Sequence, residues 1–270
     1  SQHARVSGFK PIALEAAFGP NEPLPPLIIE LNNHKKMQMR GRIDRVDATT
    51  VNGKPYIRVV DYKSSPHKLD LNDVYYGLSL QMLTYLDVAI TNSDEWLPIH
   101  AEAGGVLYIH VHNPMLSPDI SLTADEAESE RLKDFKMRGL LLDDYDSIIA
   151  MDDQLTTKSG HSQVVPVYMK KDGSTSPSQS SIIAPNDMKT LQHFVRNKHR
   201  KAGEEILEGH TDISPFRMKQ RTACEFCSYK SVCQFDTTDP EQHYRQLSVE
   251  KPDEIIQKIR KEGGQDESNS

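Results

Sequence analysis

The strongest constraint on the fold lies between residues 41 and 63, where two strand patterns flank a two-residue turn. Asn52 and Gly53 supply the two positive-φ positions that a tight type I′ turn demands. The run MQMRGRIDRVDA before the turn alternates like one half-buried strand, and the run YIRVVDY after it is rich in β-branched and aromatic residues. We expect these runs to pair antiparallel, so that Asp44 and Asp61 lie on neighbouring strands.

Strand and helix patterns alternate along the rest of the chain. The run PPLIIEL before the hairpin indicates a short strand, and GGVLYIHVH, from residue 104, indicates a buried one. The apolar spacing from Leu71 to Thr91 predicts a single helix, which Gly77 weakens only modestly. A last helix is expected from about Asp187 to Leu207, with Gly209 as its stop. Its expected apolar face comprises Leu191, Val195, Ala202 and Ile206.

Two further stretches carry weaker patterns. Thr123-x-x-Glu126 is a capping box that predicts a helix through about Met137. The segment from Asp143 to Ala184 is expected to be irregular, with KKDGSTSPSQSS as a polar, serine-rich loop. Because strands and helices are mixed and no internal repeat is found, we expect an α/β fold with a central mixed sheet flanked by helices.

Composition narrows the classes of function. A chain of 270 residues can bury one large core or two modest ones, and no apolar run approaches the roughly 20 residues of a membrane span. The formal net charge of -7 argues against a surface with general attraction to phosphate, although basic tracks occur at Lys35–Arg45 and Arg196–Lys201. We expect a cytoplasmic protein without membrane association.

The two ends of the sequence suggest a fragment. The start, SQHARVSGFKP, has no initiator methionine and no apolar signal segment, so an N-terminal truncation is expected. The end, GGQDESNS, is typical of a disordered tail.

All three cysteines lie within one short segment, residues 222–236, as Cys224, Cys227 and Cys233. The C-x-x-C-x5-C spacing is typical of a metal or iron–sulfur site, and without a secretory signal metal ligands are favoured over disulfides. A tetrahedral ion or a cubane cluster takes four ligands, so a fourth must lie elsewhere or be absent. Zinc with His210 or His243 as fourth ligand is an alternative.

The expected hairpin also carries candidate chemistry. Strand alternation places Asp61 and Lys63 on one face, and Asp44 stands on the paired strand. Two carboxylates and the carbonyl of Tyr62 are hard oxygen ligands that suit Mg²⁺, and the lysine is placed to orient or deprotonate an attacking water. The alternative is a surface ion pair worth under about 1 kcal/mol. The apolar residues just before Asp61 favour a central strand, where a carboxylate needs a partner or a metal.

Four motifs together carry a family resemblance: GRIDRVD, VVDYKSS, QMLTYL at residues 81–86, and C-x-x-C-x5-C. In order and spacing they resemble the RecB-like branch of the PD-(D/E)XK nucleases that carry an iron–sulfur staple. In particular, they are similar to the C-terminal nuclease domain of the B subunit of AddAB-type helicase–nucleases. The resemblance covers residues 41 to 233 and implies a restriction-endonuclease-like core whose edge is closed by the cysteine segment.

The resemblance also implies roles for residues at matching positions. Asp44 and Asp61 would be metal-binding aspartates, Lys63 the catalytic lysine, and Gln81 and Tyr85 the pair beside the active site and DNA. The three cysteines would be ligands of a [4Fe-4S] cluster whose fourth cysteine lies far upstream in the family and is missing from this chain. Also missing is the helix with the histidine that RecB-like nucleases add to the metal site, which His3 does not match. Glu15, in LEAAFG, is a candidate for the acidic residue that precedes the first core strand in this branch.

The function expected from the resemblance is Mg²⁺-dependent exonuclease cleavage of the 5′-ended DNA strand during double-strand break repair. The implied partners are DNA and the A subunit, as a heterodimer that carries the motor and a second nuclease. The nuclease domain is expected to span residues 1–245, followed by a helix and tail over residues 246–270. The alternatives are an inactive nuclease-fold module for DNA binding or assembly, and a zinc-binding interaction domain.

Two other groups of residues are expected to be structural. His110 and His112 alternate on a strand without an acidic or thiol partner nearby in sequence, so packing or surface roles are favoured over metal binding. The basic run at residues 196–201 lies in a predicted helix and is expected to form a solvated face, although a nuclease could use it against phosphate.

Overall fold

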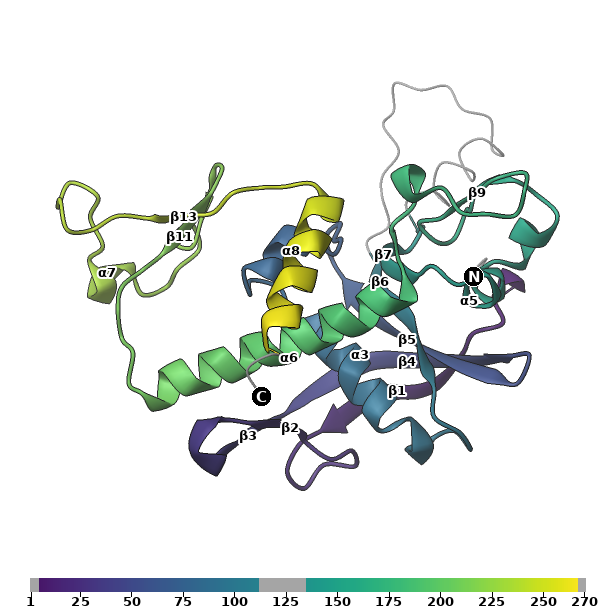
Figure 1. Ribbon diagram of the computed structural model, residues 1–270, viewed down its shortest axis with the longest axis horizontal. Coiled ribbons are helices and arrows are strands. Elements are labelled where there is room, and N and C mark those ends of the chain that lie inside the picture. Colours follow the sequence, from purple (N-terminus) through teal and green to yellow (C-terminus); the bar gives the residue numbers. More distant parts are fainter. Residues whose placement is uncertain (1–4, 112–134, 267–270) are drawn as a thin grey trace.

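A six-stranded mixed sheet forms the centre of the computed structural model, which describes residues 5–111 and 135–266 (Figure 1). The strand order is β1-β4-β5-β6-β7-β10, with parallel pairing at β5–β6 and β7–β10 and antiparallel pairing elsewhere. The strands are β1 (Lys10–Phe18), β4 (Gly41–Val51), β5 (Lys54–Lys63), β6 (Glu102–His110), β7 (Arg138–Leu142) and β10 (Ile182–Ile183). The expected α/β class with a central mixed sheet is confirmed.

The predicted hairpin is present as β4 and β5. Asn52 and Gly53 have φ values of 51° and 79°, which is the left-handed conformation that the turn requires. Val46 pairs with Val59 in the antiparallel register, and continuing that register brings Asp44 opposite Asp61. The long strand predicted before the turn is instead two strands, β3 (Lys36–Met39) and β4, and β3 pairs with β2 (Leu27–Glu30) as a separate ribbon.

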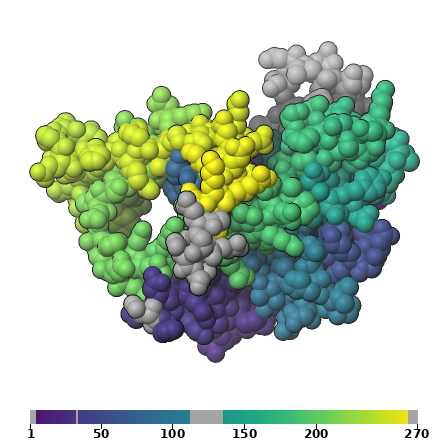
Figure 2. All heavy atoms as spheres, in the orientation of Figure 1, coloured from purple at the N-terminus to yellow at the C-terminus, as the bar shows by residue number. Residues whose placement is uncertain are grey.

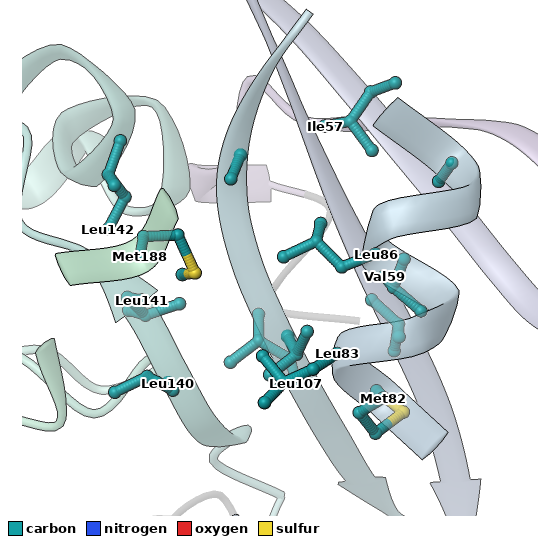
Figure 3. Packing of buried hydrophobic residues seen from close by; sticks show 14 of the residues in the cluster. Ile57, Val59, Met82, Leu83, Leu86, Leu107, Leu140, Leu141, Leu142 and Met188 are labelled. Atoms are coloured by element: carbon teal, nitrogen blue, oxygen red, sulfur yellow. The ribbon is translucent and has the colours of Figure 1, made fainter. Parts of the chain in front are cut away.

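Two helices, α3 (Gln81–Thr91) and α6 (Pro185–Leu207), cover one face of the sheet (Figure 3). In the close-up, Leu83 and Leu86 of α3 lie against Val59 and Leu107, and the four side chains have no exposed surface. Helix α8 (Pro252–Asp266) packs on α6 and on α2 (Leu71–Tyr75). Its apolar residues Ile255 and Ile259 belong to the same hydrophobic core, which therefore continues past residue 245.

The opposite face of the sheet is covered by the N-terminal segment and by α5 (Tyr145–Met151). A buried ion pair stands there, because the Arg58 guanidinium donates from Nε to Asp47 Oδ2 at 3.0 Å. Burial lowers the pKa of Arg58, and the charge of Asp47 opposes that effect. Arg45 also donates to Asp47, and the Phe9 ring lies 4.6 Å from the Arg58 guanidinium carbon. Removing either partner of this pair would leave an uncompensated buried charge.

Residues 208–250 form an extension that we call the C-terminal arm; Figures 1 and 2 show it projecting from one end of the molecule. It contains short elements: β11 (Phe216–Met218), β12 (Arg221–Thr222), α7 (Lys230–Cys233) and β13 (Arg245–Gln246). Within the arm, Met218 and Leu247 are the buried apolar residues. The arm therefore has little core of its own.

Three helix predictions need correction. The single helix predicted over residues 71–91 is two helices, because Gly77 adopts a φ of +76° and ends α2. The last helix was predicted well in its length, but Ala202 and Ile206 are exposed because the end of α6 extends beyond the sheet. A disordered tail was predicted over residues 263–270, but the first half of this stretch is helical, because α8 continues to Asp266.

Predictions for the middle of the chain also differ from the structure. Thr123 and Glu126 lie outside the described residues, and Met137, the predicted helix end, precedes β7 without being helical. The segment expected to be irregular contains α5, β10 and the small strands β8 (Gly160–His161) and β9 (Tyr168–Met169). These elements are too short to give a periodic pattern. The serine-rich stretch within the segment does form a loop, with one 3-10 turn, Pro177–Gln179.

Candidate active site

Asp61 and Lys63 lie on the same face at the end of β5, as strand alternation predicted. The Lys63 Nζ is 2.7 Å from Asp61 Oδ2, and the Asp61 side chain is only 7% exposed. This oxygen nevertheless accepts no hydrogen bond of acceptable geometry. The 2.7 Å distance shows that Lys63 and Asp61 form an ion pair. Because Asp61 Oδ2 accepts no hydrogen bond, the carboxylate can still bind a further positively charged partner. A buried carboxylate oxygen with a free lone pair is suited to a cation.

Asp44 lies opposite Asp61 in the β4–β5 register and is half-buried. Its Oδ2 accepts a hydrogen bond from the backbone N–H of Tyr62 at 3.1 Å. That bond holds the Asp44 side chain against the end of β5. The two carboxylates therefore lie on adjacent strands at one edge of the hairpin, beside an ammonium group.

Gln81 and Tyr85 stand one turn apart on α3 and contact each other. The amide Nε2 of Gln81 donates to the Tyr85 hydroxyl at 3.1 Å. The Tyr85 ring packs edge-on against Phe18, with ring centroids 5.8 Å apart. Gly41 leaves room for this packing, because a Cβ there would stand 2.8 Å from Phe18 and 3.2 Å from Tyr85. The glycine that opens GRIDRVD thus fixes the approach of α3 to the start of β4.

Glu15 lies on β1, the strand beside β4, and the register of Leu14 with Arg45 and of Ala16 with Ile43 brings it opposite Asp44. Its backbone φ is 49°, a strained value for a residue with a side chain. The carboxylate lies 3.8 Å from the Arg42 guanidinium, and both side chains are about two-thirds exposed. The strand position is compatible with the acidic role considered for Glu15, which stays a prediction.

Tyr108 of β6 was missed by the sequence analysis. It pairs with Asp61 in the parallel β5–β6 register and is 5% exposed. Burial and then the charge of Asp61 raise the pKa of Tyr108 to about 12, while a hydrogen bond with Ser79 opposes the shift. Its aromatic character within a buried apolar run resembles any core tyrosine, so no sequence signal distinguishes it.

The residues of this site suit a hard divalent cation. Within residues 5–111 and 135–266, no three His, Cys, Asp or Glu side chains form a metal-ligand group. Asp44 and Asp61 supply two carboxylates, which is the number that Mg²⁺ usually takes from a protein while keeping waters and substrate phosphate. The buried Oδ2 of Asp61, ion-paired with Lys63 but without a hydrogen bond, is the observation that favours an ion here.

Comparison with known families agrees with this geometry. The family model described as "PD-(D/E)XK nuclease superfamily" matches residues 1–234. The chain belongs to the PD-(D/E)XK nuclease superfamily. The PD-(D/E)XK core expected from the resemblance is confirmed, whereas the roles of Asp44, Asp61 and Lys63 within it stay predictions.

Three similar proteins share the name of a helicase/deoxyribonuclease subunit. The chain is 60% identical over 264 residues to the B subunit of the ATP-dependent helicase/deoxyribonuclease of Lysinibacillus sphaericus. It is 47% identical over 262 residues to the protein of the same name from Bacillus subtilis, and 43% identical over 263 residues to that of Oceanobacillus iheyensis. Each match covers 97% of this chain but only 22–23% of the relative. The chain therefore spans less than a quarter of the length of these relatives.

The three cysteines lie in the C-terminal arm as free, half-exposed thiols. The backbone N–H of Tyr229 donates to Cys227 Sγ at 3.4 Å. The candidate zinc ligands His210 and His243 do not form a metal-ligand group with the cysteines in the described residues. His210 lies 3.6 Å from Glu208 instead. Neither the iron–sulfur prediction nor the zinc alternative is tested by these observations.

The basic run on α6 was expected to be a solvated face, and this is wrong for several of its members. Arg196 makes a two-pronged ion pair with Asp87 of α3, at 2.6 and 2.8 Å. His199 Nε2 lies 2.8 Å from Thr84 Oγ1 of α3, and Lys198 Nζ lies 5.3 Å from the centre of the Tyr75 ring of α2. These side chains attach α6 to its neighbours.

The prediction for the strand histidines is tested in part. His110 Nε2 lies 3.1 Å from the carbonyl oxygen of Ser64, which is a packing contact. His112 lies outside the described residues. No helix among the described residues is both long enough and apolar enough to cross a membrane.

Proposed function

We propose that this chain is the Mg²⁺-dependent nuclease domain of a helicase–nuclease, and that it hydrolyses phosphodiester bonds of the 5′-ended DNA strand at double-strand breaks. The observation that carries the proposal is the Asp44–Asp61 pair beside Lys63, with one buried carboxylate oxygen left without a hydrogen bond. The assignment of strand polarity rests on the family resemblance alone. A cytoplasmic location accords with this function.

The chemistry divides among a few residues. Asp44, Asp61 and the backbone carbonyl of Tyr62 would hold the ion, which when bound supplies Lewis-acid polarisation of the scissile phosphate. Lys63 is placed to orient the attacking water and to neutralise charge that grows on the phosphate. Because Lys63 lies 2.7 Å from Asp61, its ammonium stays close to the reacting centre.

Gln81 and Tyr85 are the residues that we propose for contact with the substrate. Their mutual hydrogen bond fixes both polar groups on the turn of α3 nearest to β4. We propose that they contact the DNA backbone beside the scissile phosphate. Positioning contacts of this kind carry no sequence information, which suits an enzyme that degrades strands of any sequence.

Two partners follow from this proposal. The relatives' name joins an ATP-dependent helicase and a deoxyribonuclease and calls each relative a B subunit, which implies further subunits and a DNA substrate for those proteins. For this chain we propose the A subunit as heterodimer partner, and single-stranded DNA delivered by the helicase as substrate. We also propose a [4Fe-4S] cluster at Cys224, Cys227 and Cys233 with a fourth ligand from outside this chain.

The test is strand-resolved cleavage of end-labelled DNA by the full-length subunit with its helicase partner. Asp61→Ala should reduce cutting of the 5′-ended strand by at least about 100-fold, because even outer-shell partners of a metal cost 10–100-fold. Cutting of the other strand should persist, and chelation of Mg²⁺ should abolish cleavage of the wild type.

A matched control is Asp153→Ala, which removes an exposed carboxylate from the 3-10 turn Asp153–Thr156. It should leave both strands' cutting unchanged. Unchanged cutting by Asp61→Ala would overturn the catalytic proposal and favour the alternative of an inactive module for DNA binding or assembly.

A further inference from the structure

A cluster of charged side chains lies on the face of the β4–β5 hairpin opposite to the candidate metal site. Strand alternation turns Arg45 and Asp47 of β4 to this face, and Arg58 and Tyr62 of β5 with them. Arg45 donates to Asp47 from Nε at 2.5 Å and from Nη2 at 2.9 Å. Arg58 Nη2 lies 2.9 Å from Asp47 Oδ2, and these two side chains are 2% and 0% exposed. We call Arg45, Asp47 and Arg58 the Asp47 cluster.

The Asp47 cluster contains more positive charge than its carboxylate needs. Arg58 alone neutralises Asp47 from within the core, and Arg45 adds a second guanidinium to the same carboxylate. Burial lowers the pKa of Arg58, the charge of Asp47 opposes this, and the charge of Arg45 lowers the pKa further. The second arginine is therefore electrostatically unfavourable for the first. Neutralisation of Asp47 does not by itself explain why Arg45 stands there.

The remaining amino group of Arg45 connects the cluster to Tyr62. Arg45 Nη1 donates to the Tyr62 hydroxyl at 3.2 Å. Arg45 pairs with Val60 in the register, so Tyr62 is its diagonal neighbour, which a long side chain can reach. Tyr62 is 41% exposed, so packing restrains its ring only in part. Its backbone N–H donates to Asp44 Oδ2 at 3.1 Å. Direct contacts thus run from the buried cluster through Tyr62 to a proposed ion ligand on the other face.

We propose that Arg45 is a positioning residue: anchored by the buried carboxylate of Asp47, it fixes Tyr62 and thereby the two ligands that depend on Tyr62. These ligands are the Asp44 carboxylate, which Tyr62 holds by its N–H, and the Tyr62 carbonyl itself. The inference rests on the proposed nuclease function and extends it to a residue that would touch neither ion nor DNA. An arginine suits this role, because its planar fork can hold Asp47 with one edge while another amino group reaches Tyr62.

The decisive variants are Tyr62→Phe and Arg45→Met in the full-length subunit with its helicase partner. Without metal or DNA, amide hydrogen exchange of residues 61–63 should become about 10-fold faster in both, as expected when a local restraint is removed. In the cleavage assay, the Mg²⁺ concentration for half-maximal cutting of the 5′-ended strand should rise about 10-fold. The other strand, cut in the same reaction, should keep its Mg²⁺ requirement. The double variant should add little, because both substitutions break one contact.

Two variants are matched controls. Arg260→Met breaks another two-pronged ion pair, with Asp187 at 2.6 and 2.7 Å, which joins α8 to α6. Tyr56→Phe removes a phenol from the opposite end of β5, where it donates to Asp144 at 2.9 Å. Both variants should keep the wild-type exchange of residues 61–63 and the wild-type Mg²⁺ requirement.

A purely structural role for Arg45 would give a different result. The melting temperature of Arg45→Met would fall, but the Mg²⁺ requirement of both variants would stay unchanged. That result, unchanged exchange in Tyr62→Phe, or equal changes in the controls would overturn the inference. If Arg45→Met failed to fold, Tyr62→Phe would decide, because it leaves both ion pairs of Asp47 in place.

Failure of the proposed function has its own signature. In that case Asp61→Ala would cut the 5′-ended strand normally, or the wild type would not require Mg²⁺, whereas the exchange experiment would still report whether Arg45 fixes Tyr62. Fast exchange with an unchanged Mg²⁺ requirement, in a wild type that needs the ion, would overturn the positioning role alone.

Discussion

The sheet and the C-terminal arm differ most in where their apolar side chains lie. Val59 and Leu107 in the sheet have no exposed surface. In the arm, Phe226 and Val232 are 91% and 81% exposed. The sheet is therefore stabilised by burial of its own residues, whereas the arm leaves much apolar surface in contact with solvent.

The same contrast holds for the polar groups that carry chemistry. In the sheet the buried carboxylate of Asp61 is held by Lys63 and by its strand neighbours, so the site is formed before any ligand binds. In the arm the thiols of Cys224, Cys227 and Cys233 lie on loops and on the four-residue helix α7. A rigid sheet can preorganise a catalytic site, but a segment without a core needs a staple or a partner to become rigid.

The largest effect should come from truncating the core. Leu83→Ala removes a side chain with no exposed surface between α3 and the sheet and should lower the free energy of unfolding by about 3 kcal/mol. Val232→Ala, in the arm, should change it by less than about 0.5 kcal/mol. Urea denaturation of both variants measures the comparison. Equal losses would mean that the arm has a core that its exposure does not reveal.

The second prediction is that substitution of a cysteine affects the arm but not the sheet. If the three cysteines bind a cluster in the full-length subunit, Cys227→Ser should remove its brown colour and make residues 208–250 sensitive to protease, because the arm loses its staple. The melting temperature of the sheet should change little. Ser228→Ala, an exposed neighbour, is the control. A colourless wild type that contains zinc would contradict the iron–sulfur proposal.

The smallest expected effect is on the pH dependence of stability, through His199, which attaches α6 to α3. Burial lowers the pKa of His199 below its ordinary 6.5, and the charge of Asp87 opposes this. Because the folded state binds the proton less readily, stability is present above pH 6.5 and is lost as the pH falls below it.

His199→Gln should therefore flatten the dependence of unfolding free energy on pH between about pH 7 and the acid range, as measured by denaturation at a series of pH values. His193→Gln, at an exposed position on the same helix, should keep the slope of the wild type. An unchanged slope in His199→Gln would show that another group titrates.

How much was predictable depends on how local the determinant is. Asn52-Gly53 fixes a turn through backbone conformation alone, and this in turn fixed the register that brings Asp44 opposite Asp61. The single helix predicted over residues 71–91 was wrong at Gly77, which adopts a positive φ and ends α2. A glycine ends a helix only where the tertiary structure requires the chain to turn, and the local sequence does not show this. The exposure of Ile206 could not be predicted, since periodicity reports a helix face but not how far the sheet beneath it extends.

By itself the sequence determined the hairpin, the alternation that joins Asp61 to Lys63, the class of fold and the family. These are set by local conformation and short-range periodicity, which need no knowledge of the rest of the chain. Only the tertiary structure decided that Tyr108 lies beside Asp61 and that the arm stands apart from the core. Those outcomes depend on contacts between residues far apart in sequence, which the parallel crossover between β5 and β6 brings together.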